Sequence, residues 1–103
     1  MEQIKRIEEM ERCLDASREA VDRLAYALDE YEDVQSDLKD LIEYYDSDLW
    51  MSDFEDDEMG RLPEDLKRGV LSEDAVYDLI ADNRDLISRM LRVIAQETEE
   101  GSV

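Results

Sequence analysis

The acidic residues are the only side chains of this sequence whose spacing suggests catalysis, because the chain contains no histidine. Glu30 and Asp33 stand at positions i and i+3, which share one face of a helix. Carboxylates on facing helices can hold Mg²⁺, as expected of a magnesium-dependent nucleotide hydrolase. The same spacing also arises by chance in a chain with 31 Asp and Glu among 103 residues. The hydrolase is therefore the alternative hypothesis rather than the leading one.

Most other active-site chemistry is excluded by composition. Without histidine, Ser-His and Cys-His nucleophiles and imidazole zinc sites are absent. Cys13 is the single cysteine, has no neighbouring base in the sequence and falls on an apolar flank, which favours an inert thiol. No glycine-rich phosphate-binding motif is present. We therefore predict no catalytic residue, no metal site and no cofactor.

The middle of the chain carries most of its charge. Between Leu24 and Gly60 there are fourteen acids and one base, in a protein of formal net charge −19. Such a field repels nucleic-acid phosphates and anionic lipid, so the remaining candidate partners are a basic protein and a metal cation. The predicted partner-binding residues lie in "DSDLWMSDFEDDE" and are Asp46, Asp48, Trp50, Asp53, Glu55, Asp56 and Asp57. A simpler role for the aromatic residues here, Trp50 included, is to fill the end of a helical bundle.

Apolar periodicity predicts the helices that position these residues. A stripe with spacings of three and four predicts a long helix over about 3–33, formed by Ile7, Met10, Leu14, Ser17, Val21, Leu24, Leu28 and Tyr31. Ser36 is a candidate N-cap for a second helix ending near Tyr45. Ser47 is a candidate cap for a third helix that turns Trp50, Phe54 and Met51 inward.

The stretch "GRLPEDLKRGVLSEDAVYDLI" holds the only proline and two of the three glycines. Gly60 is a predicted helix stop, and 63–68 is a predicted short helix capped by Gly69. Lys67 and Arg68 would then offset the acidic repulsion nearby. Ser72 is the predicted cap of a last helix that runs to about Ala95, followed by a frayed acidic tail over 96–103.

Parts of the sequence resemble a known family. The stretch "LPEDLKRGVLSEDAVYDLI", with "ALDEYE" and "EYYDSDLW", is similar to an uncharacterised family of short bacterial proteins, catalogued as domain of unknown function forty-two ninety-eight. The likeness covers Met1 to about Ala95 and is densest from Leu62 to Ile80. It implies a compact helical protein of bacterial or mobile-element origin and carries over no catalytic residue.

Together these patterns predict an all-α fold. We expect one domain over 1–95, a four- to five-helix bundle in which two long helices lie antiparallel. The leading functional hypothesis is a non-enzymatic adaptor or inhibitor, in the bacterial cytoplasm, whose acidic face binds a basic protein surface. A narrower version is a DNA mimic. Direct nucleic-acid or membrane binding is not expected, and the oligomeric state stays open.

Overall fold

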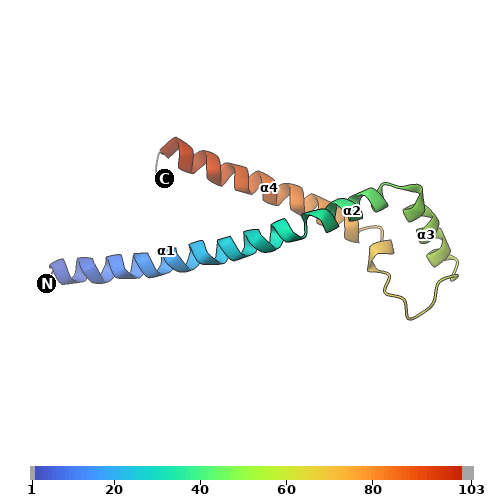
Figure 1. Cartoon of the computed structure of the whole chain (residues 1–103), viewed down its shortest axis with the longest axis horizontal. Helices are drawn as coiled ribbons and strands as arrows, with labels where there is room; N and C mark the ends of the chain where they lie inside the picture. Colours follow the sequence, from blue (N-terminus) through green and yellow to red (C-terminus); the bar gives the residue numbers. More distant parts are fainter. Residues whose placement is uncertain (1, 101–103) are drawn as a thin grey trace. The chain divides into compact units, whose positions relative to one another are not determined.

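The protein is all-α, as predicted. The computed structural model describes residues 2–100, and this part of the chain contains four α-helices, one 3₁₀ helix and no strand (Figure 1). In chain order the helices are α1 (Glu2–Asp33), α2 (Gln35–Tyr45), α3 (Asp48–Glu58), the 3₁₀ helix η1 (Gly69–Leu71) and α4 (Ala75–Glu100). The chain divides into two compact units, Met1–Leu38 and Lys39–Val103. The single domain and the antiparallel placement of the long helices stay predictions.

The long first helix is confirmed, but its apolar stripe is not covered. No residue of α1 is buried; the large apolar side chains of the stripe from Ile7 to Leu28 range from 38% exposed at Leu28 to 60% at Leu14, and Tyr31 is half-buried. Three ion pairs at helical spacing support the helix locally: Arg12 with Glu9 (2.6 Å), Arg18 with Asp22 (3.0 Å) and Arg23 with Glu19 (2.5 Å). Each such pair is exposed to solvent and adds only a small local stabilisation. Local interactions therefore account for this helix.

The break between α1 and α2 differs from the prediction. It falls at Val34, and helical hydrogen bonds continue across it, from the Val34 N–H to the Glu30 carbonyl (3.2 Å) and from the Leu38 N–H to the Val34 carbonyl (2.9 Å). Ser36 lies inside α2, so the predicted N-cap there is wrong. The reason is that a cap satisfies free N–H groups at a helix start, and here backbone bonds span the junction.

The start of α3 is at the predicted residue, with a different hydrogen bond. Ser47 holds the N-cap position in an extended conformation (φ −97°, ψ 162°) but makes no side-chain cap bond. Its hydroxyl instead donates to the carbonyl of Tyr44 at 2.6 Å. Ser47 therefore completes the end of α2 as it begins α3.

The end of α3 confirms the predicted glycine stop. Gly60 has φ +70°, in the left-handed region that favours glycine. Its N–H donates to the Asp57 carbonyl (3.1 Å), and the Arg61 N–H donates to the Asp56 carbonyl (2.9 Å). These two bonds form the Schellman pattern, which satisfies the last carbonyls of the helix.

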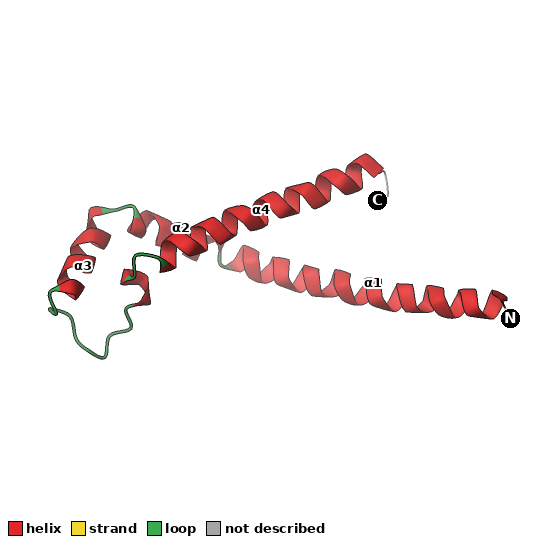
Figure 2. Ribbon diagram, turned by 180° about the vertical axis from the view of Figure 1, so that it is seen from behind, coloured by secondary structure: helices red, strands yellow, loops and turns green. Residues whose placement is uncertain are grey.

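The predicted short helix over 63–68 is wrong. These residues belong to an irregular segment, 61–68, that we call the strap, and Figure 2 shows it leaving α3 and returning to η1. Within it the Leu66 N–H donates to the Pro63 carbonyl (3.2 Å), which makes a single turn. A helix of one turn fixes several residues for very few hydrogen bonds and is unfavourable. Regular structure resumes only at Gly69, which begins η1 instead of capping a helix.

The last helix begins where the sequence predicts and extends further. The Ser72 hydroxyl accepts a hydrogen bond from the Ala75 N–H at 3.0 Å, which confirms the N-cap. The helix continues to Glu100, beyond the predicted end near Ala95. Residues 101–103 of the predicted tail lie outside the described residues.

The buried side chains of the described chain all lie in the second unit. They are Trp50 (8% exposed), Leu71 (6%) and Val76 (3%). They come from α3, η1 and α4, and η1 contacts both of the other helices. The short 3₁₀ helix therefore links α3 and α4 around this small core.

Gly60 and Gly69 provide a matched test of the α3 stop. Gly60→Ala should lower the free energy of unfolding by about 1 kcal/mol, because alanine is strained at a positive φ. A Cβ at either Gly60 or Gly69 would meet no atom within 4 Å, and only Gly60 has a positive φ. Gly69→Ala is therefore the control and should be neutral or slightly stabilising in urea unfolding. Equal losses in the two variants would contradict the backbone explanation.

Candidate functional site

The predicted partner-binding residues all lie in the second unit, but the structure separates them into three groups. One is buried, three are half-buried, and three are exposed. The grouping follows the faces of α3, because residues three or four apart share one side of a helix.

Trp50 belongs to the core. Its indole N–H donates to the Val70 carbonyl at 2.9 Å, over a separation of 20 residues. Its ring stacks on Phe54 (centroids 5.2 Å apart, planes at 18°) and meets Tyr45 edge-on (5.1 Å, 70°). A partner cannot reach this side chain, so the packing role is the one that the structure supports. Met51, predicted to turn inward with Trp50, is 50% exposed instead.

Asp53, Asp56 and Asp57 form the half-buried group, and each is paired within the chain. The Tyr44 hydroxyl donates to Asp53 Oδ2 at 2.5 Å, Arg61 Nη1 lies 3.1 Å from Asp56 Oδ1, and Arg68 pairs with Asp57. Two of these carboxylates hold the strap against α3, and the third joins α2 to α3. These three carboxylates therefore stabilise the fold through bonds within the chain.

Arg68 is the central residue of the strap. Besides Asp57, its guanidinium donates to the carbonyls of Pro63 and Leu66, the latter at 3.3 Å. The side chains of Arg68 and Asp57 are 35% and 20% exposed, so their ion pair is partly screened from water. A single side chain thus donates to two carbonyls of the irregular strap. The predicted structural role of Lys67 and Arg68 holds for Arg68 in this arrangement.

Asp46, Asp48 and Glu55 are exposed, and the structure adds Glu58 to them. We call these four residues the acidic row. Asp48, Glu55 and Glu58 lie on one face of α3 with Met51, at spacings of three and four, and Asp46 precedes the helix. Within residues 2–100, none of the four side chains has a hydrogen bond or an ion pair. The spacing of Glu58 from Glu55 is the sequence signal that would have included it.

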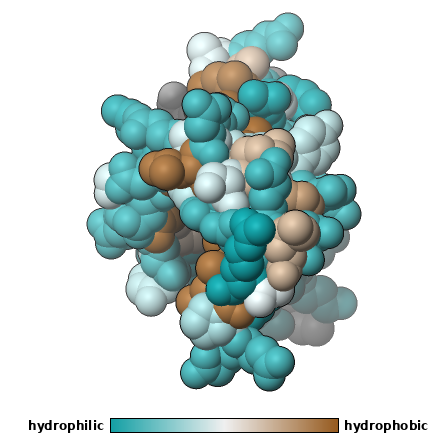
Figure 3. All heavy atoms as spheres, turned by 90° about the vertical axis from the view of Figure 1, so that its right-hand side faces the viewer, coloured by the Kyte–Doolittle hydropathy of each residue, from teal (hydrophilic) through white to brown (hydrophobic). Residues whose placement is uncertain are grey.

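Seen from the α3 side, the surface in Figure 3 is mainly hydrophilic, with apolar residues exposed between the charged ones. The exposed apolar residues beside the acidic row are Met51 (50% exposed) and Met59 (68%). Unpaired carboxylates interspersed with flexible apolar side chains suit contact with a partner that brings positive charge.

The environment of Tyr44 is electrostatically distinct. Partial burial of the phenol, together with its hydrogen bond to the carboxylate of Asp53 and the negative charge there, raises the pKa of Tyr44 to about 12. The neutral phenol is therefore the form that links α2 to α3 at physiological pH.

The described residues contain no evident catalytic constellation. No group of three or more acidic, cysteine or histidine side chains in this part of the chain is placed to hold a metal ion. Glu30 and Asp33 are exposed on α1, and Cys13 is half-buried with its Sγ 3.9 Å from Glu9 Oε1. An open hollow of about 420 Å³ beside the strap includes Asp57 and Ser72, which are engaged by Arg68 and by the start of α4.

A sequence model of a known family covers residues 7–93 of the chain, which is most of its length. The chain belongs to the DUF4298 family, a domain of unknown function. No curated protein and no solved structure matches this DUF4298 protein. In residues 2–100, no helix combines the length and apolar character needed to cross a bilayer. Family membership agrees with the resemblance seen in the sequence and adds no activity.

Substitution of the two adjacent basic residues, Lys67 and Arg68, tests how the strap of this DUF4298 protein is held. Arg68→Gln should lower the free energy of unfolding by about 2 kcal/mol, because it leaves Asp57 and the Leu66 carbonyl without their donor. Lys67 is exposed, so Lys67→Gln should change stability by less than about 0.5 kcal/mol. Urea unfolding at low and high salt measures both, with the larger Arg68 loss at low salt. Equal effects of the two variants would contradict this assignment.

The Tyr44 bond predicts a pH dependence. Below pH about 10 the phenol is neutral whether the chain is folded or unfolded, and Tyr44→Phe should cost about 1.5 kcal/mol. Because the folded-state pKa is raised to about 12, this difference should shrink as pH rises from about 10 to about 12. The control is Tyr45→Phe, which keeps the ring contact with Trp50. A stability difference that stays constant over this pH range would argue against the Tyr44–Asp53 bond.

Proposed function

We propose that this protein is a non-enzymatic adaptor or inhibitor of the bacterial cytoplasm, and that the acidic row on α3 binds a basic protein surface. The observation that supports this is the division of the acids of α3. Asp53, Asp56 and Asp57 are paired within the chain, whereas the carboxylates of the acidic row are exposed and have no partner among the described residues. The first set therefore contributes intramolecular bonds to the fold, and the second set contributes none among the described residues.

Electrostatics makes the row costly unless something binds it. Its carboxylates add to a chain of net charge −19, and such self-repulsion opposes a compact state. Lysine or arginine side chains of a partner would remove the repulsion and also speed association. Met51 and Met59 add flexible apolar contact on the same face, which favours a protein partner over a simple cation.

The DNA mimic is a less suitable version of this function. The α3 helix has 11 residues, or about 16 Å at the usual rise. A DNA duplex carries about one charge per 1.7 Å, or roughly nine over that length. The acidic row is much sparser. The magnesium-dependent hydrolase gains no supporting observation, because no group of three or more carboxylates among the described residues is placed to hold a metal ion.

The acidic row is tested by three simultaneous amide substitutions, Asp48→Asn, Glu55→Gln and Glu58→Gln. The immobilised wild-type protein is first used to capture its partner from a lysate of the native host. The triple variant should then bind that partner roughly 10- to 100-fold more weakly at low salt. Most of the loss should be in the association rate, measured by surface plasmon resonance. The helical circular dichroism signal should be unchanged, because none of the three side chains has an intramolecular bond.

A matched control changes the same amount of charge elsewhere. Asp29→Asn, Glu30→Gln and Asp33→Asn alter three exposed acids of α1 and should leave binding nearly unchanged. Equal weakening by both triple variants would mean that net charge, rather than the acidic row, drives binding. Unchanged affinity of the α3 variant would refute the proposal.

A further inference from the structure

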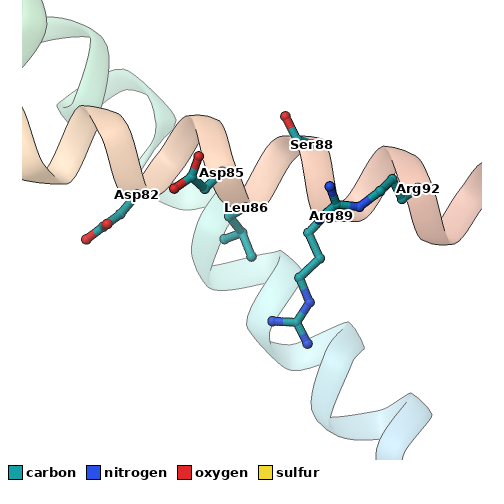
Figure 4. Close-up of a pocket in the computed structure, with 6 residues that line it drawn as sticks. All are labelled: Asp82, Asp85, Leu86, Ser88, Arg89 and Arg92. Carbon is teal, nitrogen blue, oxygen red and sulfur yellow. The ribbon is translucent and has the colours of Figure 1, made fainter.

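A second exposed face lies on α4 and differs from the acidic row in charge. Leu79, Leu86 and Val93 follow one another at intervals of seven residues and are 44%, 43% and 55% exposed. Beside them lie two acids followed by two bases, Asp82, Asp85, Arg89 and Arg92, which line an open hollow of about 490 Å³ with Leu86. Figure 4 shows Asp82, Leu86 and Arg89 leaving the helix toward the same side. We call this set the α4 face.

The four charges of the α4 face are unpaired within residues 2–100. Asp85 and Arg89 are spaced i and i+4, as are Arg18 and Asp22, which do form an ion pair on α1. The charges of the α4 face are therefore available to another molecule. The face is also neutral, since two acids balance two bases, in a chain of net charge −19.

From this order of charges we infer that the α4 face is a two-fold interface, where a second copy of the chain packs antiparallel against α4. With the two-fold axis beside Leu86, this residue meets Leu86 of the second copy, and Leu79 lies opposite Val93 of the second copy. Asp82 then lies at the level of residue 90 of the second copy, within about 1.5 Å along the axis of its Arg89. The symmetry repeats each contact, as an isologous interface requires.

The charge order selects both the occupant and its direction. A parallel copy would place acids beside acids and bases beside bases, which is unfavourable. A basic partner would be attracted to the acidic row of α3 rather than to a neutral face. A second copy is repelled by most of the surface but meets no net like charge here. This inference uses another helix than the proposed function and does not depend on it.

The test uses two variants of the chain, one in which all four charges of the α4 face are basic and one in which all four are acidic. One variant carries Asp82→Arg and Asp85→Arg, which makes the face wholly basic, and the other carries Arg89→Asp and Arg92→Asp, which makes it wholly acidic. In sedimentation velocity at moderate salt, the wild-type chain should shift with concentration from its mass of 12.1 kDa to twice that mass. Each variant alone should sediment as one chain, and an equal mixture should restore the two-chain species.

A second variant tests the apolar centre of the interface. Leu86→Asp places two like charges beside the two-fold axis and should abolish the two-chain species. Leu91→Asp is the control, because Leu91 is 61% exposed and lies off the Leu79–Leu86–Val93 row. Circular dichroism verifies that each variant keeps its helical content.

Three results would overturn the inference. The wild-type chain sedimenting as one chain at every concentration would exclude the two-fold interface. A two-chain species that survives in both charge variants would place the interface elsewhere. A mixture that fails to recover it, when each variant is a single chain, would exclude the antiparallel pairing.

Discussion

The indole of Trp50 is the contact on which the second unit depends. It is buried between two aromatic rings, and its N–H donates to the carbonyl of Val70, the middle residue of η1. This single bond joins α3 to the segment that leads into α4, across a strap with no regular structure. A buried indole without an acceptor would be costly, so the position of η1 and that of Trp50 are mutually constrained.

The strap makes use of the acidity of α3. Arg61 and Arg68 pair with Asp56 and Asp57, so two of the acids that would otherwise repel each other instead fasten the irregular segment. Arg68 also supplies donors to two strap carbonyls. The gathering of the proline, two glycines and the Lys-Arg pair in this stretch is thereby explained: the chain must end one helix, cross to η1 and begin another while keeping its backbone polar groups bonded.

The exposed faces of α3 and α4 differ in kind. The acidic row is uniformly negative, whereas the α4 face has acids at one end and bases at the other. A surface of one charge sign favours a partner of the opposite sign. A helix face on which acids are followed by bases favours an antiparallel second copy of itself. The kind of partner that each surface would favour therefore differs.

Residues close in sequence determined the elements of this protein. The span of α1, the glycine stop of α3 and the Ser72 cap of α4 follow from caps, backbone conformation and spacings of three or four, which the sequence displays directly. The predictions at Ser36 and over 63–68 are wrong, since bonds across the first junction and from Arg68 replaced those that local rules assume. The sequence predicted that Trp50 turns inward; tertiary structure alone decided which groups it contacts and which acids of α3 are paired. These outcomes rest on contacts between residues 9 to 20 positions apart, Tyr44 to Asp53, Arg68 to Asp57 and Trp50 to Val70, and no local pattern encodes where such distant groups meet.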